Sequence, residues 1–260
     1  MGSATAADYG WIRSSFVFPS GIEVGYSLTL VRGVPPEEVL RVMGAEPRGG
    51  CRGAEELFER QDELVAGSDE WDESFLAGVC AVPGGDGDWT LVLHFDGGIG
   101  MRPGFLETLS AGSRAVMHSS NGGKPIHMFE WYEDGELRAG FEWPTVRHGS
   151  APDDLVPLMH EAGFDLGEES DVDTYDRKAA VLALAEQLTG VRLTEDLLGN
   201  STYLLGHVPE EPADDWTGVV IDLTDANRQG IHKEVTREQV EHAMEHHRAH
   251  RDRPLRLDEP

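Results

Sequence analysis

Closely spaced turn signals between short β-type segments constrain the fold of this chain most. Apolar, β-branched and aromatic residues form segments that are mostly five to eight residues long, a length typical of strands. Glycine-rich or Asn-Gly turns separate them, and such turns join neighbouring antiparallel strands. The sequence therefore predicts an antiparallel meander, with strands at 75–82, 89–95, 114–118, 126–132 and 137–143. Further strands are predicted at 22–32, 203–208 and 216–223.

Helical spacing of apolar residues predicts helices around this sheet. Pro35 and Pro36 precede a short helix that ends before Gly44, because proline is tolerated in the first turn and glycine favours the end. The clearest pattern is Tyr175 to Leu188, which stops at Gly190. The other predicted helices cover 53–65, 105–109, 155–160, 194–199 and 236–251.

Together these patterns predict an α+β fold, in which helices cover an antiparallel sheet of hairpins and the C-terminal portion is more helical. Residues 8–150 are expected to be mainly antiparallel β with short helices, and 151–208 a helical portion packed on the same core. Residues 209–260 are expected to hold an acidic loop, a strand and a terminal histidine-rich helix.

The charge of the chain limits its partners. Asp and Glu number 48 against 21 Lys and Arg, a net charge of −27. A surface this negative repels nucleic-acid phosphates and anionic lipids. Neither nucleic acid nor a membrane is therefore an expected partner. The acidity either maintains solubility or attracts a basic protein.

The location expected from the sequence is the cytoplasm. The two cysteines, Cys51 and Cys80, do not form a CxxC pair, and no apolar segment approaches the length of a membrane span. The first residues also lack the charged and apolar regions of a secretory signal.

Four large aromatic residues recur at every second position of two neighbouring predicted strands. Phe129 and Trp131 lie on the first strand, and Phe141 and Trp143 lie on the second. Residues at period two share one face of a strand. These rings therefore form either a core layer or an exposed binding patch.

Three histidines recur at every fourth position of the last predicted helix. His242, His246 and His250 would share one helical face, and 242–246 matches the H-x-x-E-H pattern of inverted zincins. Those enzymes need a further zinc ligand well downstream, which this sequence lacks. The histidines therefore either lie on the surface of a solvated helix without a role, bind nickel or zinc adventitiously, or supply ligands to a zinc site.

Other catalytic motifs are absent. No G-x-S-x-G nucleophile elbow occurs, so the sequence predicts no catalytic residue of that kind and no bound cofactor. Cys51 lies beside Arg48 and Arg52, two cations that could lower a thiol pKa, whereas Cys80 is expected to fill an apolar strand.

Four stretches of the chain resemble an uncharacterised actinobacterial family classified as a domain of unknown function. They are 27–44 (SLTLVRGVPPEEVLRVMG), 89–93 (WTLVL), 109–116 (LSAGSRAV) and 188–194 (LTGVRLT). The resemblance covers roughly residues 8 to 208. Arginine-rich, lysine-poor usage also suits high-GC bacteria. The resemblance implies no activity or functional residue.

The function favoured by these observations is non-enzymatic protein–protein binding, such as the neutralisation of a basic partner by an immunity protein. Two alternatives remain open: a metal-dependent hydrolase that uses the histidine-rich helix, and a small-molecule sensor with a pocket between sheet and helices. The sequence leaves the oligomeric state open.

Overall fold

The computed structural model describes residues 3–15, 25–65, 74–95, 101–120, 127–167, 174–210, 218–224 and 230–236, together with Gln239 and His242. The chain divides into two compact units, Met1–Glu210 and Glu211–Pro260, which are described separately.

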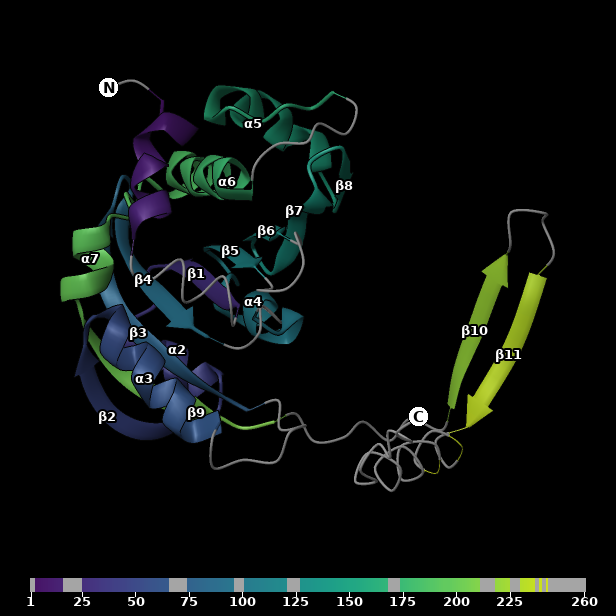
Figure 1. The fold of residues 1–260 in the computed structure, drawn as a ribbon, viewed down its shortest axis with the longest axis horizontal. Coiled ribbons are helices and arrows are strands. Elements are labelled where there is room, and N and C mark those ends of the chain that lie inside the picture. Colours follow the sequence, from purple (N-terminus) through teal and green to yellow (C-terminus); the bar gives the residue numbers. More distant parts are fainter. Residues whose placement is uncertain are drawn as a thin grey trace, which may run out of the picture. The chain divides into compact units, whose positions relative to one another are not determined.

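The first unit is built on a nine-stranded antiparallel sheet (Figure 1). Its spatial order is β2-β9-β3-β4-β1-β5-β6-β7-β8, which places β1 at the centre. The strands are β1 (Tyr26–Arg32), β2 (Glu46–Arg52), β3 (Phe75–Gly84), β4 (Gly87–His94), β5 (Arg114–Ser120), β6 (His127–Glu133), β7 (Glu136–Trp143), β8 (Val146–His148) and β9 (Thr202–Val208). The predicted α+β class is confirmed.

The predicted hairpins are confirmed, but the continuous meander is wrong. β3 pairs with β4, β5 with β6, and β6 with β7. β4 and β5 do not pair with each other, because β1 lies between them and is hydrogen-bonded to both. Turn signals report only neighbours in sequence, so they could not reveal this insertion of an earlier strand.

Two strands of this sheet were absent from the prediction because neither looks like a buried strand. β2 contains Pro47, Gly49 and Gly50, and nearly all of its residues are exposed at the sheet edge. β8, at the other edge, is only three residues long. β9 was predicted, and the structure places it between β2 and β3, so the chain returns to the sheet after the helical portion.

Helices cover both faces of the sheet. The first face packs against η1 (Ala6–Ser14), α3 (Gly53–Val65), η2 (Pro152–Leu155), α5 (Val156–Ala162), α6 (Thr174–Thr189) and α7 (Glu195–Asn200). The second face packs against α2 (Pro36–Val42) and α4 (Pro103–Leu109). Of these, the sequence predicted all but η1 and η2.

Local capping explains where the predicted helices begin and end. Thr194 is the N-cap of α7, and its hydroxyl accepts a hydrogen bond from the Leu197 amide at 3.0 Å. Gly163 and Gly190 follow α5 and α6 with φ of 101° and 66°, a left-handed conformation that glycine adopts without strain.

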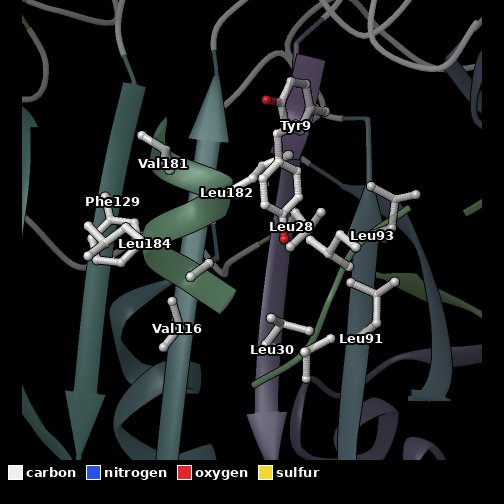
Figure 2. Close-up of a cluster of buried hydrophobic side chains, with 14 of the residues drawn as sticks. Tyr9, Leu28, Leu30, Leu91, Leu93, Val116, Phe129, Val181, Leu182 and Leu184 are labelled. Atoms are coloured by element: carbon white, nitrogen blue, oxygen red, sulfur yellow. The ribbon is translucent and has the colours of Figure 1, made fainter. Parts of the chain in front are cut away.

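Helix α6 is the most deeply buried helix of the fold. Its residues 179 to 185 are each at most 5% exposed, although they cover every side of the helix. The sheet covers one side of α6, and η1 and α5 pack on others. Figure 2 shows Leu182 and Leu184 among Leu28, Val116 and Phe129 of the sheet. A helix that is apolar all round requires such enclosure.

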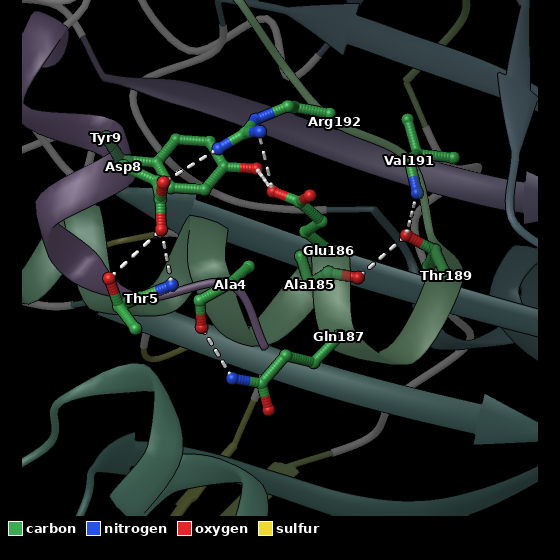
Figure 3. Close-up of polar contacts among 10 residues, drawn as sticks. All are labelled: Ala4, Thr5, Asp8, Tyr9, Ala185, Glu186, Gln187, Thr189, Val191 and Arg192. Carbon is green, nitrogen blue, oxygen red and sulfur yellow. Dashed lines mark hydrogen bonds and ion pairs between the residues drawn. The ribbon is translucent and has the colours of Figure 1, made fainter. Parts of the chain in front are cut away.

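Polar contacts fix η1 and the turn after α6 around the end of that helix (Figure 3). The Tyr9 hydroxyl donates to Glu186 Oε2 at 2.7 Å, and Arg192 pairs with Asp8 at 2.9 Å. Gln187 Nε2 also donates to the Ala4 carbonyl at 2.6 Å. The N-terminal segment is thereby held on the helix that it helps to bury.

The second unit contains one described hairpin, β10 (Gly218–Thr224) and β11 (Gly230–Thr236). β10 was predicted and β11 was not. Beyond it, the Thr236 amide donates to Gln239 Oε1 at 3.1 Å, and the Gln239 amide donates to the Thr236 hydroxyl at 3.3 Å. This reciprocal pair is the capping box predicted at the start of the last helix.

The burial of α6 predicts a large cost for truncating it. Leu184→Ala should lower the free energy of unfolding by about 2–5 kcal/mol, because Leu184 is fully buried and its removal leaves a cavity. Val146→Ala, at a position that is 68% exposed, should change it by no more than about 0.5 kcal/mol. Denaturant unfolding of both variants measures the difference. Similar small effects would contradict the central place of α6.

Candidate functional site

The four aromatic residues considered for binding do not form one exposed patch. Phe129 and Phe141 face each other across β6 and β7, with ring centroids 5.2 Å apart, and are almost fully buried. Trp131 is also buried, on the same face. The patch hypothesis is therefore wrong for these three rings, because α6 and its neighbours cover that face of the sheet.

Only Trp143 among them reaches the surface. It is 38% exposed, and the Arg177 guanidinium lies 5.3 Å from its ring centroid. Val146, in the next strand, is 68% exposed. Two exposed residues are too few to define a binding surface.

The terminal histidines fall mostly outside the described residues. His242 is described and exposed, whereas His246 and His250 lie outside the described ranges. Within those ranges, no three His, Cys, Asp or Glu side chains gather as metal ligands. The zinc hypothesis for the last helix stays a prediction.

Burial makes both cysteines poor nucleophiles. Burial and, secondarily, the Glu56 carboxylate raise the pKa of Cys51 to about 11. Burial likewise raises the pKa of Cys80 to about 11. The neighbouring arginines therefore do not activate Cys51, and both thiols act as core residues.

Exposed carboxylates gather on two helices that pack together. Helix α3 presents five acidic residues on its outer side, and Glu56 alone of these pairs with a cation, Arg60, at 2.9 Å. Helix α7 adds two more at its first turn. Six of these carboxylates are exposed and form no ion pair within the described residues, and we call them the acidic face: Glu55, Glu59, Asp62, Glu63, Glu195 and Asp196.

Glycines bring α3 and α7 close enough to make one surface. The Gly53 amide donates to the Ser201 carbonyl at 2.9 Å. A Cβ at Gly53 would lie 2.4 Å from the Gly199 carbonyl oxygen, so no larger residue fits there. Figure 1 shows α3 and α7 on the same side of the sheet.

A second unusual region lies at one end of the central strands, where several polar side chains are buried. β1 begins at this end, whereas β4 and β5 finish there. Alternation along β1 places these side chains on both faces. On the α6 side lie Tyr26, His118, Ser120 and Lys178, and on the opposite face lie Ser27, Thr29, His94 and Ser119.

Lys178 is the most unusual member of this group. It belongs to α6 and is 1% exposed. Its ammonium lies 5.4 Å from the ring centroid of Tyr26, and the Tyr26 and His118 rings meet edge to face at 5.5 Å. Because burial disfavours the charged amine, the pKa of Lys178 falls to about 8. Burial raises the pKa of Tyr26.

The opposite face holds separate titratable groups. His94 stacks on Phe75 at 4.3 Å between ring centroids. Burial raises the pKa of Glu130, on β6, to about 7. The sheet separates these groups from Lys178, so the two sets do not form one site.

Lys178 and the residues around it, Tyr26, His118 and Ser120, were not identified from the sequence because they match no known motif. The helix itself was predicted from its apolar spacing, but Lys178 was not singled out. One signal was available: Lys178 immediately precedes the unbroken apolar run 179–185, in a chain with three lysines and eighteen arginines.

A family model matches residues 2–213, which is most of the chain. The match covers nearly all of the first compact unit, Met1–Glu210, and extends to residue 213. The chain belongs to the DUF6461 family. DUF6461 is described as a family of unknown function, so this membership assigns no activity. Neither the curated proteins nor the solved structures include a significant match to this DUF6461 chain. Within its described residues, no helix is both long and apolar enough to cross a membrane.

The buried amine of this DUF6461 protein predicts a distinctive pH dependence. Lys178→Met should raise the free energy of unfolding at pH 7 by up to about 3 kcal/mol, at about 1.4 kcal/mol per pKa unit, because an apolar side chain replaces a buried charge. The pKa of Lys178 in the folded protein is below its value in the unfolded chain. The stability penalty of the buried charge is therefore fully present below pH 8.

Above that pH the folded protein releases the proton first, and wild-type stability rises relative to the variant up to about pH 10.5. Denaturant unfolding of both proteins between pH 7 and about pH 10.5 measures this narrowing gap. Parallel curves would show that Lys178 is not a buried titrating amine.

Proposed function

We propose that this DUF6461 protein binds a basic protein partner through the acidic face and neutralises it without catalysis, as immunity proteins do with their toxins. The observation that carries the proposal is the concentration of six exposed carboxylates without ion pairs, among the described residues, on α3 and α7.

Electrostatic considerations support this choice of surface. Like charges close together on adjacent helices repel one another, so this arrangement costs stability in the free protein. A basic partner would relieve the repulsion and would be attracted over long range by the net charge of −27. A backbone hydrogen bond from the Gly53 amide to the Ser201 carbonyl links the two helices at the acidic face.

We also propose a cytoplasmic location and an actinobacterial source for this chain. Two buried free cysteines suit a reducing compartment. The excess of eighteen arginines over three lysines suits a high-GC genome.

Matched neutralisation of two surfaces tests the binding proposal. One triple variant removes charge from the acidic face (Glu59→Gln, Asp62→Asn, Glu63→Gln). Its control removes the same charge from exposed positions on α2, α4 and β7 (Glu37→Gln, Glu107→Gln, Glu136→Gln). The immobilised wild-type protein captures partners from a native-host extract, and the affinity of any basic partner is then measured with purified components at two salt concentrations.

The proposal predicts that the acidic-face variant binds the partner at least about tenfold more weakly, with a smaller salt dependence, while the control stays within about twofold. Equal weakening by both variants would indicate a diffuse charge effect. That result, or the absence of any salt-sensitive basic partner, would overturn the proposal.

A further inference from the structure

The ammonium of Lys178 lies inside the protein, and no carboxylate among the described residues lies beside it. Among the described residues it forms neither an ion pair nor a hydrogen bond, and burial accounts for its lowered pKa. Two arginines near the same helix do have carboxylate partners. Arg114 pairs with Glu133 at 2.7 Å, and Arg192 pairs with Asp8 at 2.9 Å. Lys178 differs from these two arginines, because no described carboxylate pairs with it.

Packing alone does not explain a lysine at this position. Residues 179–185, which follow it in α6, are all apolar and buried, and methionine or leucine would suit the same environment. The contact with the Tyr26 ring offsets only part of the hydration that the ammonium loses. A costly buried charge without a structural partner points to a role in binding.

The groups around Lys178 are suited to an anion. Tyr26 lies directly opposite Ser120 in the pairing of β1 with β5. His118 precedes Ser120 by two residues on β5, so it lies on the same face of the sheet. Ser120 Oγ is buried and forms no hydrogen bond within the described residues. An ammonium, two hydroxyls and an imidazole can all donate hydrogen bonds to one oxyanion. No described carboxylate lies against Lys178 to compete for it.

We infer that Lys178, Tyr26, His118 and Ser120 form the anion-recognising part of a binding site for a small molecule that carries a carboxylate or phosphate group. The negative group would supply the charge that Lys178 lacks and would form charge-assisted hydrogen bonds in a dry environment. Lys178 projects from the helix and the other three from the sheet, so the ligand binds between α6 and the central strands.

The low lysine content makes this inference directly testable by NMR. The full chain contains three lysines, so carbon-13 labelling of lysine Cε gives few signals, and Lys178→Met assigns the one of interest. Inorganic phosphate and malonate are titrated separately in the millimolar range at constant ionic strength, with chloride as the reference.

The expected result is a saturable change of the Lys178 signal and a rise in its pKa with at least one oxyanion, while the other two lysines do not respond. A response to phosphate alone assigns a phosphate-bearing ligand, and a response to malonate alone assigns a carboxylate. If neither oxyanion changes the Lys178 signal beyond the chloride reference, the inference is wrong.

Calorimetric titration of variants locates the binding. Lys178→Met should abolish binding or weaken it at least about tenfold, and Tyr26→Phe and Ser120→Ala should each weaken it by about three- to tenfold. Tyr203→Phe is the matched control, because this buried hydroxyl donates to the Leu198 carbonyl on the same face. Circular dichroism confirms that each variant is folded. Unchanged binding by folded Lys178→Met would overturn the inference.

Discussion

The fold depends on the burial of α6 against a sheet that alone could not enclose it. The helix has no polar side along residues 179–185, so it needs cover in every direction. The sheet provides one side, and η1 and α5 provide others. The contacts of Tyr9 with Glu186 and of Arg192 with Asp8 hold η1 in place. The core around α6 therefore requires η1, α5 and the sheet, which are distant from one another in the sequence.

The same enclosure gives Lys178 its chemical character. A lysine at the surface of this acidic chain would be hydrated and surrounded by carboxylates, whereas the buried Lys178 lies over the aromatic ring of Tyr26. The acidic face on α3 and α7 has the opposite character, because its charges are hydrated and exposed. The protein therefore separates its proposed protein-binding charges from its proposed small-molecule site.

Most helices and strands could be predicted from local sequence patterns, whereas the pairing of strands distant in sequence could not. Asp134 and Gly135 adopt positive φ between β6 and β7, and Gly190 does so after α6, so the sequence marked both boundaries. The insertion of β1 between β4 and β5 has no local signal. β2 was missed because its exposed glycines and arginines lack the alternation of a buried strand. Lys178 matches no known motif, and the conflict between its charge and its burial becomes evident only in the packed fold.

Native-state hydrogen exchange of α6 tests the central claim most directly. If the enclosure of α6 holds the first unit together, the amides of residues 179–185 should exchange only through global unfolding, with the same free energy and denaturant dependence as unfolding itself. Amides of the edge strand β2 should exchange through smaller openings. Exchange of α6 by a local opening, well below the global free energy and insensitive to denaturant, would contradict the account.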